Sequence, residues 1–266
     1  MRYNGVTLWA GVLLMGMAVT AGCEDSKNET QGGYELTAKE DIEAYIAEHW
    51  AEYGYSEKPT KYIALSFDDG PCAPSSSGGT AAMLEALEAA KVKATFFVIG
   101  QNVRSNRVAA QAIFDAGHEL GNHSDGYDSL GGKTVDAINT SLGAASWAIS
   151  DITGKDPALF RAPDLNHGTN LSSVCKNRGL ALIDGSVHND WPGSSAAIKS
   201  SVLAKVHDGG IIILHENNTS RGNTMSVLPE IISDLREKGF WIMTVSELAI
   251  VKGKTLEAGT RYGSIY

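Results

Sequence analysis

Several residue types that would indicate particular classes of protein are scarce in this sequence. It has 22 Lys and Arg against 31 Asp and Glu, a net charge of −9, and no block of basic residues. We therefore expect no nucleic-acid binding, because neutralising phosphates requires clustered cations. Only three residues are cysteine, and neither Cys72 nor Cys175 stands in a recognisable Cys/His catalytic setting. Whether these two cysteines pair, as they could in an exported protein, stays open.

The one long hydrophobic run lies at the N-terminus, at residues 6–20 after Arg2. It is shorter than the roughly 20 residues of a transmembrane helix and typical of a signal peptide. The run ends in Thr-Ala-Gly-Cys23, which resembles a bacterial lipobox with a lipidated cysteine. We expect residues 1–22 to be a lipoprotein-type signal and Cys23 to anchor the protein to the membrane of the cell envelope. Ordinary signal cleavage and secretion is the alternative.

The rest of the chain has the composition of a globular protein, with 43% hydrophobic residues. Residues 23–36 are polar and contain a Gly pair, which indicates a flexible tether. Apolar residues at helical spacing predict an accessory helix within 37–59. We expect the main domain at 60–252 and treat 253–266 as a C-terminal extension. The sequence does not determine the oligomeric state, and we expect a monomer.

Within the main domain, short apolar runs alternate with longer amphipathic stretches. Strands are predicted at 62–67, 94–99, 118–121, 158–161, 180–183, 210–214 and 240–244. Helices are predicted at 80–90, 104–116, 134–152, 171–178, 196–206 and 226–238. This alternation predicts an α/β fold with a parallel sheet, and about seven units favour a (β/α) barrel over an open sheet. Functional residues of such folds gather where strands end.

Polar residues do follow the predicted strands. Asp68 and Asp69 end the first strand before a Gly-Pro turn, which would let both carboxylates bend into one pocket. His123 ends another strand, and an imidazole near carboxylates is a typical ligand set for Zn²⁺. Arg161 follows a third strand, and His215 ends a run of four apolar residues, as a general acid could. Each feature also has a plain structural explanation, such as a solvated turn or a salt bridge.

Taken together, five motifs resemble the polysaccharide deacetylases, which are carbohydrate esterase family 4 or the NodB-homology domain. They are Ser-Phe-Asp-Asp-Gly at 66–70, His-Ser at 123–124, Arg-Ala-Pro at 161–163, Asp-Trp at 190–191 and Leu-His at 214–215. They follow the order and separations of the family. The resemblance implies a distorted (β/α) barrel that removes acetyl groups from N-acetylglucosamine polymers or from O-acetylated xylan. Acetylated polysaccharides or oligosaccharides are therefore the expected partners.

The resemblance also implies a role for each matching residue. Asp68 corresponds to the catalytic base and Arg161 to the residue that orients it. His215 corresponds to the catalytic acid, and Asp190 to the carboxylate that pairs with it. Trp191 is expected to form a platform or wall for a sugar ring.

The metal site departs from the family pattern. Asp69 and His123 match metal ligands, but Tyr127 stands at the usual position of a second histidine, and a phenol is a poor Zn²⁺ ligand at neutral pH. Three alternatives remain: Asp69 and His123 bind the metal with waters, Asp128 or Asp125 supplies a third ligand, or the metal is lost and the protein only binds glycans. We expect a divalent metal, Zn²⁺ first and Co²⁺ or another ion as alternatives. Tyr127 is then expected to contact substrate.

The third motif departs as well. Pro163 and Asp164 stand where a Pro-Tyr pair is common, and both are expected to line the substrate site. The backbone N–H after Pro163 could stabilise an oxyanion. The Arg-x-Pro-x-Leu pattern is more similar to the xylan-directed members of the family. The sequence therefore tilts towards an acetylxylan esterase, with an N-deacetylase as the alternative.

Overall fold

A computed structural model describes residues 38–73, 79–188, 194–216 and 222–266. The expected signal peptide, the tether with Cys23, and the site residues Asp190 and Trp191 lie outside the described residues. No helix within the described ranges is both long and apolar enough to cross a membrane.

The described strands form one curled sheet in which every strand-to-strand pairing is parallel. The strands are β1 (Lys61–Asp68), β2 (Thr95–Val98), β3 (Glu119–Asn122), β4 (Leu159–Phe160), β5 (Ala181–Ile183), β6 (Val187–His188), β7 (Gly210–His215), β8 (Phe240–Met243) and β9 (Arg261–Tyr262). Their order is β6-β7-β1-β2-β3-β4-β5-β9, and β8 pairs with β1 away from this path. This arrangement confirms the predicted distorted (β/α) barrel.

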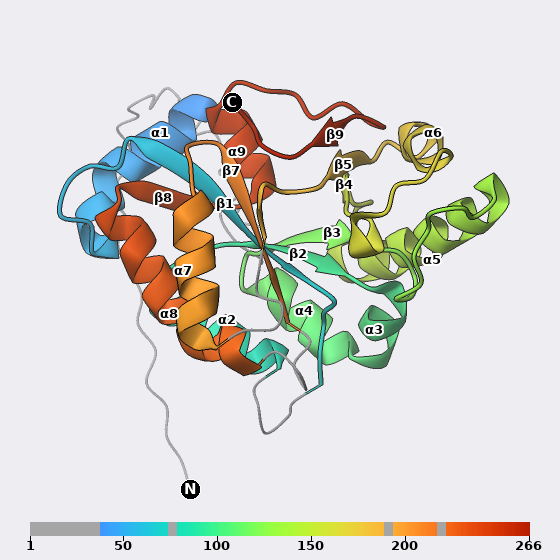
Figure 1. Cartoon of the computed structure of the whole chain (residues 1–266), viewed down its shortest axis with the longest axis horizontal. Helices are drawn as coiled ribbons and strands as arrows, with labels where there is room; N and C mark the ends of the chain where they lie inside the picture. Colours follow the sequence, from blue (N-terminus) through green and yellow to red (C-terminus); the bar gives the residue numbers. More distant parts are fainter. Residues whose placement is uncertain (1–37, 74–78, 189–193, 217–221) are drawn as a thin grey trace, which may run out of the picture.

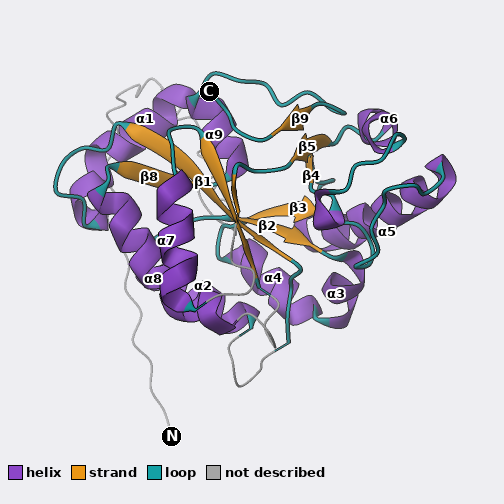
Figure 2. Ribbon diagram, viewed as in Figure 1, coloured by secondary structure: helices purple, strands orange, loops and turns teal. Residues whose placement is uncertain are grey.

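Helices surround the sheet, as Figures 1 and 2 show. They are α1 (Lys39–His49), α2 (Thr80–Ala89), α3 (Gly100–Ser105), α4 (Arg107–Asp115), α5 (Val135–Thr153), α6 (Leu171–Asn177), α7 (Ser195–Lys205), α8 (Gly222–Glu237) and α9 (Val245–Val251), with 3-10 turns η1 (Trp50–Tyr53) and η2 (Pro163–Leu165). The predicted helix at 104–116 is divided between α3 and α4 because Asn106 leaves the helical conformation, with φ −125° and ψ 48°.

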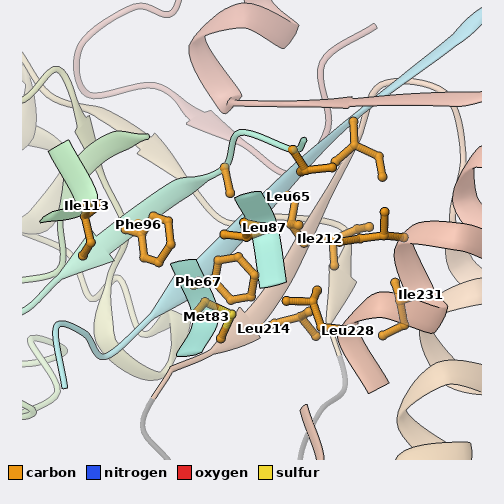
Figure 3. Packing of buried hydrophobic residues seen from close by; sticks show 14 of the residues in the cluster. Leu65, Phe67, Met83, Leu87, Phe96, Ile113, Ile212, Leu214, Leu228 and Ile231 are labelled. Atoms are coloured by element: carbon orange, nitrogen blue, oxygen red, sulfur yellow. The ribbon is translucent and has the colours of Figure 1, made fainter. Parts of the chain in front are cut away.

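Strand β1 shows how the sequence places the site. Ile63, Leu65 and Phe67 pack with α2 and α8 in the main hydrophobic core. Figure 3 shows Leu65 and Phe67 in this core. Successive side chains of a strand point to opposite faces, so Ser66 and Asp68 face the inside of the curl instead. The last six residues of β1 are all buried. Both faces of the strand are therefore covered, as in other parallel sheets.

The segments outside the expected main domain pack against it. Helix α1 contacts α9, and the rings of Tyr45 and Tyr53 lie 6.5 Å and 5.1 Å from the ring of Trp241 in β8. The stretch 253–266, treated above as an extension, contains β9 and the buried Ile265. It is thus part of the sheet and its core.

Cys72 and Cys175 are both free thiols in the structure, so the disulfide that the sequence left open is not formed.

Candidate functional site

The predicted polar clusters meet at one end of the sheet. Asp68 ends β1 and lies opposite His215, the last residue of β7, in the strand register. His123 directly follows β3, and Arg161 directly follows β4. Because the strands are parallel, their carboxyl ends share one edge, which brings residues from four strands together.

Arg161 holds the carboxylate of Asp68. The guanidinium is completely buried, and its Nη1 donates to Oδ1 of Asp68 at 2.6 Å and to Oγ of Ser66 at 2.8 Å. Its Nε donates to the carbonyl of Ile183 at 2.9 Å, and its charge lies 4.0 Å from the ring centre of Phe97. These contacts fix one oxygen of Asp68 and leave the other, Oδ2, for chemistry.

The charges around Asp68 keep it ionised. Burial by itself would raise the pKa of this carboxyl, but the electrostatic effects of Arg161, His123 and His215 together outweigh burial and lower it. Arg161 shows the opposite balance: burial lowers its pKa, and Asp68 raises it again. An ionised carboxylate held in one orientation can accept a proton from water, as a general base must.

His123 is oriented like a metal ligand. Its Nδ1 lies 2.8 Å from the backbone carbonyl of Arg161. A carbonyl can only accept, so Nδ1 donates, and in the neutral imidazole Nε2 then presents its lone pair. Nε2 lies 3.6 Å from Oδ1 of Asp69 and 3.9 Å from Oδ2 of Asp68. An imidazole nitrogen facing carboxylate oxygens is a donor set that suits a divalent transition metal.

Asp69 reaches this group through its own backbone. On a regular strand its side chain would point away from that of Asp68. The φ angle of Asp69 is 74°, in the left-handed region, so the chain turns at this residue and not only at the Gly-Pro that follows. Asn102 of α3 donates from Nδ2 to the carbonyl of Asp69 at 2.8 Å and so supports the turned conformation.

Tyr127 lies at the rim of the site. Its side chain is 52% exposed, and its hydroxyl accepts from Nδ2 of Asn102 at 2.8 Å and donates to the carbonyl of Asp69 at 3.4 Å. The phenol thus contacts the backbone that carries Asp69. The ring is exposed at this position, and its contact with substrate stays a prediction.

The structure does not bring Asp128 to the proposed metal ligands. Its carboxylate is 87% exposed and lies 3.6 Å from Lys133. Asp125 is also engaged elsewhere, 2.8 Å from Arg104. Among the described residues no three His, Cys, Asp or Glu side chains form a group that could hold a metal. The prediction of Asp128 as a ligand is therefore corrected: the loop after His123 directs it to the surface.

The third motif forms the turn η2 beside the site. Pro163 is buried and Asp164 is exposed, and Asp164 and Leu165 have φ angles of 55° and 52°. Asp190 and Trp191 lie outside the described residues, so their contacts with His215 and substrate stay predictions.

Two residues near the site had no assigned role in the sequence analysis. Asn102 supports Asp69, and its position just after the end of β2 is the signal that could have found it. Glu216 follows His215 and is 1% exposed, and Thr80 donates to its carboxyl. Burial raises the pKa of Glu216 to about 7. A Cβ at Gly70 would lie 1.7 Å from Oε1 of Glu216, so this carboxyl requires glycine in the Asp-Asp-Gly turn.

Comparison with known proteins agrees with this geometry. The family model "Polysaccharide deacetylase" matches residues 55–183. A bifunctional xylanase/deacetylase of Pseudobutyrivibrio xylanivorans is 38% identical over 203 residues, which are 75% of this chain and 32% of that protein. The peptidoglycan-N-acetylglucosamine deacetylase PgdA of Listeria monocytogenes is 32% identical over 77% of this chain and 42% of its own length. This chain thus spans less than half the length of these two relatives.

A solved structure is similar over its whole length. It is a family 4 acetyl xylan esterase from Clostridium thermocellum, in complex with a cobalt ion. It is 32% identical and superimposes with a TM-score of 0.70, covering 77% of this chain and 99% of that one.

Proposed function

Since this chain belongs to the polysaccharide deacetylase family, we propose that it is a metal-dependent hydrolase that releases acetate from acetylated glycans, with O-acetyl xylan preferred. One observation carries the proposal. Asp68 is held by a buried arginine on one oxygen and faces His123 with the other. Such an oriented carboxylate beside a nitrogen lone pair is what activation of a water requires.

Asp69 and His123 would hold the metal, with waters completing its coordination. Zn²⁺ suits an imidazole and carboxylate set, and the similar acetyl xylan esterase holds cobalt. When bound, a divalent ion supplies positive charge that makes water more acidic and polarises the acetyl carbonyl. A site with two protein ligands would bind more weakly than one with three.

The residues of the chain would divide the proton transfers between them. Asp68 accepts a proton from the attacking water at Oδ2, while Arg161 keeps the carboxylate in place. His215, across the strand register from Asp68, donates a proton to the departing oxygen or nitrogen. Asp190 is proposed to keep His215 charged. The backbone N–H of Asp164 after Pro163 is proposed to stabilise the oxyanion.

An ester is the favoured substrate for a chemical reason. A sugar alcohol leaves more readily than an amine, so a weakly held metal costs less rate on O-acetyl xylan than on an N-acetyl group. The similarity to an acetyl xylan esterase supports this preference. The similarity to a peptidoglycan deacetylase supports the alternative, N-deacetylation of chitin-like or peptidoglycan-like chains. A glycan-binding protein without catalysis is the third candidate.

The location of the protein stays a proposal from sequence alone. We propose export and lipid attachment at Cys23. Metabolic labelling with a radioactive fatty acid should label the wild-type protein and not the Cys23→Ser variant, and an unlabelled wild-type protein would contradict the anchor.

The deciding experiment measures acetate release by the soluble domain from acetylxylan and from an N-acetylglucosamine oligomer, with and without Zn²⁺ or Co²⁺. Asp68→Asn should abolish release. Asp151→Asn, which changes an exposed carboxylate paired with Arg107, should leave it intact. The better substrate decides between ester and amide. If neither substrate releases acetate and the protein binds no metal, the proposed hydrolase activity is wrong, and glycan binding without catalysis remains as the candidate function.

A further inference from the structure

The C-terminal strand brings a charged residue to the edge of the candidate site. Strand β9 lies parallel to β5, with Arg261 opposite Leu182 and Tyr262 opposite Ile183. The backbone N–H of Asp184 donates to the carbonyl of Tyr262 at 2.9 Å. Arg261 is therefore held next to Asp184, the residue that follows β5.

Two segments of the chain, β9 and the loop after η2, contact the carboxylate of Asp184. Nε and Nη2 of Arg261 donate to its Oδ2 at 3.1 Å and 2.7 Å, and Nε2 of His167 lies 2.8 Å from its Oδ1. The side chain of Asp184 is 15% exposed. A half-buried carboxylate whose Oδ2 accepts two hydrogen bonds from one guanidinium has little freedom to reorient, and its Oδ1 lies beside the ring of His167.

The residue before Asp184 also contacts the catalytic end of the sheet. The carbonyl of the preceding residue, Ile183, accepts from Nε of Arg161. The backbone that leads into Asp184 is therefore held against that buried guanidinium. His167 lies two residues after η2, the turn that carries Pro163 and Asp164. The segment at Asp184 thus connects Arg161, the η2 loop and the C-terminal strand.

We propose that Asp184 is a positioning residue of this site, and that Arg261 of β9 and His167 hold it so that the η2 loop keeps its shape for substrate. The inference rests on the proposed function, because the loop matters only if it contacts a glycan. It assigns the C-terminal segment a part in substrate binding. The family model ends at residue 183, before both Asp184 and Arg261.

The test is Arg261→Gln, with Arg261→Lys as the conservative variant. Lys252→Gln is the matched control, since Lys252 also pairs with an aspartate, Asp208, at 2.5 Å near the C-terminal end of the chain. Arg261 is 56% exposed and Asp208 is 42% exposed, so each pair has one partner in solvent and contributes little to stability, and all variants should fold.

Two readouts separate positioning from general stability. Hydrogen exchange of the peptide 162–170 should be about tenfold faster in Arg261→Gln and unchanged in Lys252→Gln. On the substrate that wild type prefers, KM should rise about five- to tenfold while kcat changes less than about twofold. Arg261→Lys should recover part of both effects, because it keeps the charge without the two-pronged contact.

The outcomes are distinguishable from failure of the proposed function. If wild type releases no acetate, the proposed function fails, and the exchange of 162–170 alone decides the positioning role. If the exchange and KM of Arg261→Gln equal those of Lys252→Gln, the positioning role is overturned. A loss of kcat with unchanged exchange overturns it as well.

Discussion

At the scale of single residues, the buried charge of Arg161 organises the site. It is the largest side chain among the described residues that is removed from solvent completely. A nearby counter-charge and hydrogen bonds offset the cost of burying such a charge, and here Ser66, Ile183 and Asp68 accept from its Nε and Nη1. The contacts that offset the cost of burying Arg161 also fix the orientation of Asp68.

Replacing Arg161→Met should therefore affect stability and activity together. Removing one partner of a buried ion pair costs about 3–5 kcal/mol, because Asp68 is left without its counter-charge. Urea denaturation should show this loss, and acetate release should fall at least about 100-fold, as expected when a general base loses its orientation. Arg107→Gln, which breaks an exposed pair with Asp151, should cost no more than about 1 kcal/mol. Equal stability losses in the two variants would contradict this account.

The buried His118 should make the stability of the protein sensitive to acid. Burial lowers its pKa to about 3, and the nearby charge of Lys93 acts in the same direction. Unfolded, the imidazole titrates near 6.5, so between pH 6.5 and 3 the unfolded chain binds a proton that the folded protein does not. The free energy of unfolding should therefore fall with pH, by about 2 kcal/mol at pH 5 from this group.

The variant His118→Asn removes the titrating group and keeps a polar side chain near the N–H of Ala94, which donates to His118 at 3.1 Å. Urea denaturation at pH 7 and pH 5 measures how much free energy of unfolding is lost between the two pH values. This loss should be about 2 kcal/mol smaller in the variant than in wild type. The same pH dependence in variant and wild type would show that His118 is not responsible.

At the scale of elements, the stability of the short helix α9 depends on the contacts of its first turn. Helix α9 has only seven residues, too few to be stable by itself. Thr244 and Glu247 form a reciprocal capping box at its start. The N–H of Val245 donates to Oγ1 of Thr95 at 2.8 Å, which ties the helix to the neighbouring strand. The helix is thus fixed by its first turn and by its buried face.

Thr244→Ala should lower the free energy of unfolding by about 1–2 kcal/mol, because it leaves N-terminal N–H groups of α9 without a partner. Thr134→Ala removes the simpler cap of the 19-residue helix α5, where Oγ1 of Thr134 accepts from Ala137 at 3.2 Å. The exposed cap of a long helix should cost less, about 0.5 kcal/mol. Denaturant midpoints of the two variants check this order, and a reversed order would refute it.

At the scale of the whole molecule, the curl of the sheet gathers residues far apart in sequence. Asp69, His123 and Arg161 come from three different strand ends. A metal held by two of them would link β1 to β3 and would bind only the folded protein. Such a ligand stabilises the fold by mass action.

Adding Zn²⁺ at 100 times its dissociation constant to chelator-treated protein should therefore stabilise it by about 2.7 kcal/mol and raise Tm by about 5–10 °C. His123→Ala should abolish the shift. Tyr127→Phe should retain most of it, because the phenol donates to the backbone carbonyl of Asp69. An undiminished increase in Tm in His123→Ala would show that the metal binds at another site.

The sequence by itself determined the fold class and the strand ends at which the polar residues gather. Buried parallel strands read as apolar runs, so β1, β2 and β7 and the polar residues at their ends could be predicted. Asp68, Asp69, His123 and Arg161 lie together as their strand-end positions indicated. Local pattern suffices here because chain direction and periodicity decide which residues reach the shared edge.

Only the tertiary structure decided what local pattern does not encode. The left-handed turn at Asp69, the support from Asn102 and the outward direction of Asp128 depend on how loops pack. Strand β9 is two residues long, too short for a periodic signal, and exists because β5 offers it a free edge. Its placement beside Asp184 follows from long-range backbone pairing, which joins residues about 80 positions apart and leaves no trace in the local sequence.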